Sequence, residues 1–281
     1  MMIINGMKGL GDNIYQRAFI KQLPRGVWLE TPWPELYKDI PDINLILPVT
    51  RLRTQMKNIC RQPKRTWQRR PRGTVVQVGY GREGIFPGMM RSFARTPGEM
   101  DLPDFGPSPV DGRYVVIRPA TVRSEWRADT RNPLPEYIAQ AATEMRRRGY
   151  KVVSVADLVE GREWALDPLP VADLQFHRGE LPVDQLLALV QGAAAVIGGI
   201  GWLLPAAIAA KVQALIICGG QGGYNAPELI TSKAMDVSRI EFVVPDNFCR
   251  CTQKEHNCDK RISNYAERLT AWASRLPAVV G

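Results

Sequence analysis

Two series of alternating strand and helix patterns constrain this chain more than any other feature. Met2–Asn5 is a short apolar run, and a glycine-containing loop at 6–11 leads into a helical pattern from about Asn13 to Leu23. Further short apolar runs lie at 27–29, 45–47 and 75–78. Such alternation is typical of a parallel sheet that helices cover on both faces. We therefore predict an α/β fold.

Residues 97–112 interrupt this pattern with seven prolines and glycines, and a second series follows. Strands are predicted over 114–117, 151–155, 194–197 and 214–218, and helices over 135–148, 184–191, 202–210 and 263–276. A chain of 281 residues is long enough for two domains. The predicted organisation is an N-terminal Rossmann-like domain at 1–108, a second at 112–262 that faces it across a cleft, and a C-terminal helix at 263–281.

The net charge of +9 comes from one segment, residues 51–72, which holds nine lysines and arginines and no acidic residue. The segment is either a solvated basic face or a surface for a phosphate-rich acceptor such as DNA, RNA or a phosphorylated lipid headgroup. Trp67 would stack on a base or sugar in the second case, or anchor the core in the first. The candidate acceptor contacts are Arg61, Lys64, Arg65 and Trp67.

Composition predicts a cytoplasmic protein. Hydrophobic residues make up 45% of the chain, which suffices for a globular core. Five cysteines are too few for a secreted disulfide framework, and the N-terminus has no signal-peptide pattern. Residues 186–210 lack charged side chains, but glycines and a proline interrupt them. We therefore expect no membrane insertion.

The first candidate site is Gly9-Leu10-Gly11-Asp12, between the first predicted strand and helix. Glycines allow a tight turn and close approach of the backbone to a ligand. Asp12 is either a helix N-cap or a carboxylate that points into the cleft.

The second half contributes a glycine loop and an arginine-rich loop. Gly198, Gly199 and Gly201 lie between a buried strand and an apolar helix, where amide groups and the helix dipole would bind a diphosphate. Alternatively, these glycines allow the helix that follows them to pack closely on the sheet. Arg118 and Arg123 follow a predicted strand, and guanidinium groups bind phosphate oxygens well. The alternative is a basic solvated loop.

These motifs resemble the ADP-heptose:lipopolysaccharide heptosyltransferase family, whose members are GT-B glycosyltransferases. Gly9-Leu10-Gly11-Asp12 is similar to the family's N-terminal G-x-G-D, and residues 123–126 are similar to its basic-x-x-Trp stretch. Residues 195–219 are similar to the segment that holds the donor's diphosphate. The resemblance implies two Rossmann-like domains, with Asp12 as the catalytic base and with Gly11, Arg118, Arg123, Gly198, Gly199 and Gly201 as donor contacts.

The implied activity is an inverting transfer of a sugar from a nucleotide-sugar to an acceptor hydroxyl. The acceptor would be anionic, either a lipopolysaccharide-type saccharide or a hydroxymethylated base of phage DNA. No D-x-D sequence occurs, so no cofactor is expected for catalysis. The donor loop departs from the family pattern at Gly199-Ile200-Gly201 and Leu204-Pro205. Two alternatives remain open: a non-catalytic nucleic-acid-binding protein on a degenerate GT-B fold, and a nucleotide-sugar epimerase.

A separate group of metal-binding residue types lies near the C-terminus. Cys249, Cys251, His256 and Cys258 fall within ten residues. Three thiols and an imidazole suit a structural zinc ion, although C-x-C is less usual than C-x-x-C. The alternative is reduced surface cysteines beside a loop histidine.

Overall fold

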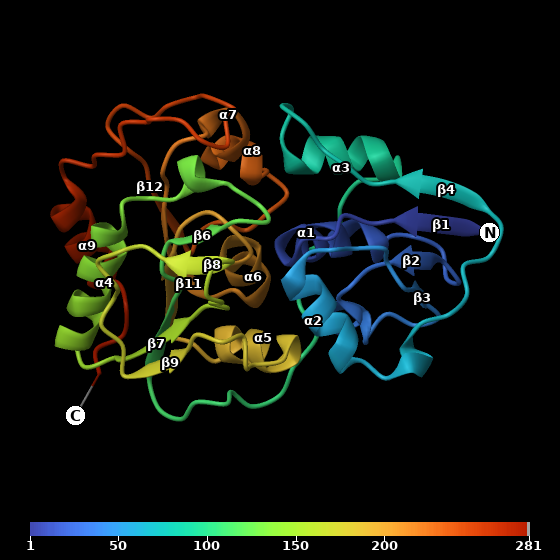
Figure 1. Ribbon diagram of the computed structural model, residues 1–281, viewed down its shortest axis with the longest axis horizontal. Coiled ribbons are helices and arrows are strands. Elements are labelled where there is room, and N and C mark those ends of the chain that lie inside the picture. Colours follow the sequence, from blue (N-terminus) through green and yellow to red (C-terminus); the bar gives the residue numbers. More distant parts are fainter. Residues whose placement is uncertain (280–281) are drawn as a thin grey trace.

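A computed structural model describes residues 1–279 and contains two parallel sheets that lie in separate halves (Figure 1). The N-terminal sheet has the order β3-β2-β1-β4, and all its pairs are parallel. Its strands are β1 (Met2–Asn5), β2 (Trp28–Glu30), β3 (Asn44–Ile46) and β4 (Thr74–Gln77). The predicted apolar runs are therefore strands, each placed within one residue of its expected position.

The C-terminal sheet has six parallel strands in the order β12-β11-β10-β5-β7-β9. They are β5 (Tyr114–Ile117), β7 (Lys151–Val155), β9 (Leu174–Phe176), β10 (Ala195–Gly198), β11 (Gln213–Ile217) and β12 (Ile240–Val243). The central strands β5 and β10 are buried along their whole length, and β11 is buried after Gln213, because helices cover both faces. A small antiparallel pair, β6 (Thr121–Arg123) with β8 (Glu163–Ala165), stands at the carboxyl end of β5. This pair corrects the expectation of a plain loop after Ile117.

Helices surround the N-terminal sheet. They are α1 (Leu10–Ile20), the 3-10 turns η1 (Pro34–Tyr37) and η2 (Lys64–Thr66), α2 (Arg53–Arg61) and α3 (Ile85–Phe93). Helix α1 begins directly after the glycine loop, with Gly9 as its N-cap. The first helix therefore starts earlier than predicted, and Asp12 lies in its first turn. The N-cap alternative for Asp12 is wrong.

Four helices of the second half match predicted ones to within three residues at each end: α4 (Pro135–Arg147), α5 (Val183–Gln191), α6 (Leu203–Ala210) and α9 (Tyr265–Ala273). Three short helices were not predicted: η3 (Asp129–Arg131), α7 (Gly222–Asn225) and α8 (Pro227–Ile230). Helix α4 begins with proline, whose fixed φ suits the first helical position. Helix α9 lies inside the predicted C-terminal helix, whose last two residues, 280–281, are outside the described part of the chain. Among residues 1–279, no helix has the length and apolar character needed to cross a membrane.

The two halves pack against each other through α1 and α6, which lie side by side at the centre of the molecule (Figure 1). One apolar core runs through this contact and joins side chains of both halves, including Phe19, Phe86, Leu203 and Leu204. A Cβ atom at Gly11 would lie only 3.0 Å from the Trp202 Cα atom. The start of α1 and the start of α6 therefore meet at the boundary between the halves.

Candidate functional site

A cavity of about 770 Å³ lies between the two halves, where α1 and α6 begin. Its N-terminal wall comes from the loop before α1, the first turns of α1, α2 and the segment around Tyr80. Its C-terminal wall comes from the loops after β5, β7 and β10. In a parallel sheet, the carboxyl ends of the strands are where ligands bind. The predicted cleft is therefore present as a cavity between the two Rossmann-like halves.

Asp12 lines this cavity from the first turn of α1. Its carboxylate accepts a hydrogen bond from the Tyr80 hydroxyl, with 2.9 Å between the oxygens. Burial raises the pKa of Asp12 above its ordinary value of 3.8, although Tyr80, Arg131 and the backbone N–H of Gly9 each act to lower it. A carboxylate with a raised pKa is a better proton acceptor than an ordinary one. Asp12 can therefore act as a general base.

Tyr80 is a hydrogen-bond partner of that carboxylate, although 68 residues separate the two in the chain. Burial of its hydroxyl and the charge of Asp12 raise the pKa of Tyr80 far above its ordinary value, so it stays a neutral donor. The hydrogen bond therefore stabilises the ionised form of Asp12. Sequence reasoning missed Tyr80, because nothing local in Gly79-Tyr80-Gly81 marks it.

Opposite Asp12, the C-terminal wall carries three arginines: Arg118, Arg123 and Arg131. Burial and the neighbouring Arg123 lower the pKa of Arg118 to about 10, while Glu163 opposes the shift. Arg123 Nε lies 2.8 Å from the Glu163 carboxylate, and an Arg118 terminal nitrogen lies 3.9 Å from it. One buried carboxylate thus offsets only part of this positive charge, and the wall can bind an anion.

Arg131 is the arginine that interacts electrostatically with both Asp12 and Tyr80. Its Nε atom is buried and has no hydrogen-bond partner among the described residues. A buried donor without a partner carries a free-energy cost unless a ligand or water satisfies it. Arg131 is therefore available to an anionic ligand. Arg131 is not among the donor contacts predicted from the sequence, although it lies eight residues after Arg123.

The glycine loop after β10 divides into a packed part and an open part. Gly198 and Gly199 do not line the cavity: a Cβ at Gly198 would lie 3.2 Å from Leu203 Cδ2, and one at Gly199 would lie 2.8 Å from Pro133 Cδ. Close packing therefore explains these two glycines. Gly201 does line the cavity, has open space where its Cβ would be, and sits just before α6. Gly11 lines it from the opposite side.

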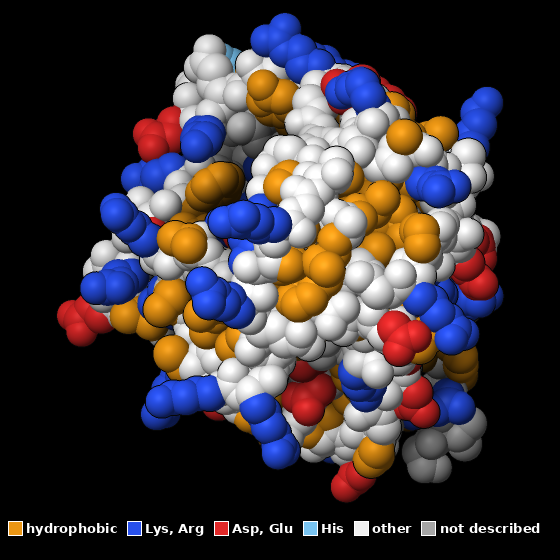
Figure 2. Space-filling model, turned by 90° about the vertical axis from the view of Figure 1, so that its right-hand side faces the viewer, with side chains coloured by type: hydrophobic (Ala, Val, Ile, Leu, Met, Phe, Trp, Pro, Cys, Tyr) orange, Lys and Arg blue, Asp and Glu red, His pale blue; other side chains and the backbone are white. Residues whose placement is uncertain are grey.

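The predicted acceptor contacts are only partly brought together. Arg61 lines the cavity, and its guanidinium donates to the carbonyls of Gly179 and Leu181 in the other half. Lys64 and Arg65 are exposed on η2, and Trp67 is half-buried; none of the three lines the cavity. Figure 2 shows that lysines and arginines are spread widely over the face of the N-terminal half.

Helix α2 accounts for part of the basic segment in structural terms. Arg53 and Lys57 both reach Asp157 of the other half, at 2.7 and 2.6 Å. Arg53 also lies 2.8 Å from Glu163. These cations hold the two halves together beside the cavity. They are not free for an external acceptor.

Cys249, Cys251, His256 and Cys258 come together as predicted, with their ligand atoms all within 4.8 Å of one another. The two sulfurs of Cys251 and Cys258 are 3.7 Å apart, and Cys249 Sγ lies 3.6 Å from His256 Nδ1. Zinc–sulfur bonds of about 2.3 Å in a tetrahedron place two sulfurs about 3.8 Å apart. The four side chains therefore fit a tetrahedral metal ion.

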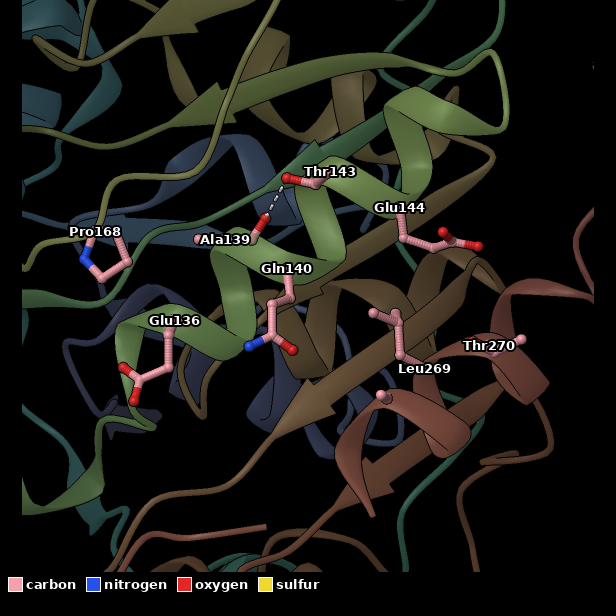
Figure 3. Close-up of a pocket in the computed structure, with 9 residues that line it drawn as sticks. Glu136, Ala139, Gln140, Thr143, Glu144, Pro168, Leu269 and Thr270 are labelled. Carbon is pink, nitrogen blue, oxygen red and sulfur yellow. Dashed lines mark hydrogen bonds between the residues drawn. The ribbon is translucent and has the colours of Figure 1, made fainter. Parts of the chain in front are cut away.

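A second hollow, of about 420 Å³, lies between α4 and α9 on the outer side of the C-terminal half (Figure 3). Glu136 and Glu144 are its charged lining residues, and the Thr143 hydroxyl donates to the Ala139 carbonyl instead of facing a ligand. Within the described chain, its lining holds no basic, thiol or imidazole group. This hollow offers no comparable chemistry.

Comparison with solved structures identifies the fold. The bacterial iron-containing dodecameric glycosyltransferase TibC from enterotoxigenic E. coli is similar over 98% of this chain and 75% of its own, with 16% identity and a TM-score of 0.59. A glycosyl transferase family 9 protein from Veillonella parvula is similar over 98% and 96%, with 12% identity and a TM-score of 0.60. The E. coli heptosyltransferase WaaC with ADP-2-deoxy-2-fluoro heptose is similar over 98% and 99%, with 10% identity and a TM-score of 0.58.

These similarities confirm the predicted GT-B fold of two Rossmann-like units, and they confirm a structural resemblance to heptosyltransferases. Neither a protein-family model nor a curated protein matches the chain.

Proposed function

We propose that this chain is a glycosyltransferase that moves a sugar from a nucleotide-sugar donor to an acceptor hydroxyl. One observation carries the proposal: a carboxylate with a raised pKa, Asp12, faces a cluster of arginines across a cavity between two Rossmann-like halves. A base on one wall and diphosphate-binding groups on the other are what such a transfer requires. The GT-B fold supports this by analogy.

In the proposed reaction, Asp12 accepts the proton of the acceptor hydroxyl as the oxygen attacks the anomeric carbon. The bond between the sugar and the diphosphate breaks, and the leaving group carries away the electron pair. Arg118, Arg123 and Arg131, with the amide of Gly201, would stabilise the charge that develops on the leaving diphosphate. Attack from the side opposite the leaving group inverts the anomeric centre. The arginines would supply this stabilisation without a catalytic metal ion.

The donor is best sought first among ADP-sugars, because WaaC is described with an ADP-heptose analogue. The acceptor is proposed to be anionic. Arg51 and Arg61 line the cavity, and the exposed Lys64 and Arg65 continue the positive charge outward from it. A saccharide that carries phosphate groups or a hydroxymethylated DNA base would both meet this charge.

The test is release of free nucleoside diphosphate from a panel of nucleotide-sugars, with and without phosphorylated saccharides or hydroxymethylated DNA. We expect release that depends on the acceptor. Turnover without an acceptor would instead indicate an epimerase. Binding of DNA with no turnover of any donor would favour the non-catalytic nucleic-acid-binding alternative, which the exposed cations at 64–72 support.

Replacement of Tyr80 with Phe should move the acidic limb of the pH–rate profile to higher pH. The Tyr80 hydroxyl stabilises the ionised form of Asp12, so its loss raises the pKa of Asp12 further. Activity that needs the ionised base is then lost at a higher pH than in the native protein. A profile of kcat against pH from about 4 to 9 checks this. An unchanged acidic limb would contradict the assignment of Asp12 as the titrating base.

We propose a structural zinc ion at Cys249, Cys251, His256 and Cys258, where it would stabilise the fold of the surrounding loop. TibC is described as iron-containing, so iron must be measured alongside zinc. Elemental analysis should find about one metal ion per chain, and Cys251→Ser should lower the content several-fold. Cys60→Ser, which changes an exposed cysteine of α2, should leave it unchanged. Less than about 0.3 zinc or iron per chain would remove the proposal.

A further inference from the structure

The Cys/His loop, residues 249–260, packs directly on the cavity turn, residues 126–132. The backbone N–H of Thr130 donates to the Lys254 carbonyl at 3.1 Å, and the Lys260 ammonium donates to the Asp129 carbonyl at 3.0 Å. The Lys254 ammonium lies 4.9 Å from the centre of the Trp126 ring. The loop that gathers the possible metal ligands therefore also holds the segment that carries Arg131.

The opposite side of the cavity turn rests on Gly219 and Gly220, just after β11. A Cβ at Gly219 would lie 2.0 Å from the Asn132 carbonyl oxygen. A Cβ at Gly220 would lie 2.3 Å from Cys258 Sγ and 3.0 Å from Thr130 Cγ2. The Gly220 N–H also donates to the Thr130 carbonyl at 2.7 Å. The turn is thus enclosed between a glycine pair and the Cys/His loop, and Cys258 lies against Gly220 of that pair.

The Cys/His loop is held from outside but has little internal structure. Besides its bonds to the cavity turn, its Cys249 and Cys251 carbonyls accept hydrogen bonds from the N–H groups of Gly222 and Gly223, at 2.8 and 3.0 Å. Residues 244–264, between β12 and α9, contain neither helix nor strand. The hydrogen bonds that hold the loop internally are few, and its side chains at 253–257 are exposed. A loop of this kind becomes well ordered when a metal ion cross-links it. A metal ion bound by this loop would therefore also hold the cavity turn in place.

Arg131, at the end of η3, would transmit this dependence to the cavity. Thr130 is 1% exposed, so the turn cannot shift without breaking buried contacts. The next residue, Arg131, lines the cavity and interacts electrostatically with Asp12 and Tyr80 from the other half. A change in the turn therefore changes which groups face Asp12.

We propose that a thiophilic divalent metal ion, bound by Cys249, Cys251, His256 and Cys258, fixes the cavity turn and thereby places Arg131 to bind the diphosphate of the donor. Arg131 is then a binding residue, and the four metal ligands are positioning residues. The identity of the ligand rests on the proposed function. The dependence of the turn on the metal does not.

Hydrogen exchange tests the first step without reference to activity. Amides of residues 126–132 should exchange at least about tenfold faster after zinc is removed with a chelator, and in Cys251→Ser. Amides of α3, in the other half, should be unaffected, and Cys60→Ser should behave as the native protein does. Equal exchange of residues 126–132 in the metal-loaded and metal-free proteins would overturn the proposal, as would failure to bind either zinc or ferrous iron.

Calorimetric titration with ADP, UDP and GDP tests the second step. Arg131→Met and zinc removal should each weaken binding of the preferred diphosphate by about tenfold or more. If the metal acts through Arg131, removing zinc from Arg131→Met should cause little further loss. If the affinity losses from Arg131→Met and from zinc removal multiply, the metal acts through a group other than Arg131. That result would overturn the proposal. If the native protein binds none of the three, the proposed function and the role of Arg131 fail together, whereas hydrogen exchange still decides whether the metal fixes the turn.

Discussion

Replacement of Asp12 with Asn should lower kcat by about 10²- to 10⁴-fold, the usual contribution of a general base. Asn keeps the shape of the side chain and can still accept the hydrogen bond from Tyr80. It cannot accept the proton of the acceptor hydroxyl. Steady-state release of nucleoside diphosphate in the presence of acceptor is the measurement. If the variant kept more than about a tenth of the native turnover, Asp12 would not be the base.

The same variant should be at least as stable as the native protein at pH 7. Because the pKa of Asp12 is raised by folding, the folded protein binds this proton more tightly than the unfolded chain does. Ionisation of Asp12 above about pH 4 therefore lowers the free energy of unfolding, and Asn removes that loss. Asp111→Asn, an exposed change outside the cavity, is the matched control and should alter neither kcat nor stability. Loss of activity together with loss of stability would point to a structural role for Asp12.

The features that could be predicted from the sequence are those that local patterns encode. Strand β5 and strand β7 coincide with their predicted ranges, because short runs of buried apolar residues admit few other structures. The Cys/His group could also be predicted, because its four members lie within ten residues of one another in the chain. For Asp12, the local pattern left a helix N-cap and a cleft carboxylate both open, and it was the resemblance to heptosyltransferases that implied the second. The structure places the Asp12 side chain at the cavity.

Helix α2 was missed because its inward face is polar. Gln55 and Asn58 are its buried residues, and Asn58 donates to the Pro32 carbonyl. A helix that buries hydrogen-bonded polar groups leaves no apolar stripe for sequence reasoning to detect. The strands β6 and β8 have three residues each, too few for a period-2 pattern to be distinguished from a loop.

The partners of the candidate site were beyond prediction because they are distant in the chain. Tyr80 reaches Asp12 across 68 residues, and Arg53 reaches Glu163 across 110. The first pair depends on how the elements of the N-terminal half pack on one another, and the second depends on how the two halves pack. No local spacing encodes either arrangement. Packing of α6 on β10 within the C-terminal half decides that Gly198 faces Leu203, whereas Gly201 faces the cavity.

Replacement of Glu163 with Gln should lower the free energy of unfolding by about 3–5 kcal/mol, which is typical when one partner of a buried ion pair is removed. Glu163 is 1% exposed and lies within 4 Å of three guanidinium groups, those of Arg53, Arg118 and Arg123. Gln leaves Arg118 and Arg123 close together without a carboxylate partner among the described residues, whereas Arg53 keeps its ion pair with Asp157. Urea denaturation at pH 7 measures the effect. A loss below about 1 kcal/mol would mean that solvent or rearrangement compensates the arginines.

Glu99→Gln is the matched control, because Glu99 pairs with Lys211 on the surface and both side chains are more than half exposed. Loss of this ion pair should change the free energy of unfolding by no more than about 0.5 kcal/mol. Added pyrophosphate should stabilise Glu163→Gln more than it stabilises the native protein, since Arg118 and Arg123 line the cavity and would lack their carboxylate. Glu163 and a bound diphosphate then offset the same positive charge. Equal stabilisation of both proteins would show instead that the anion binds away from these arginines.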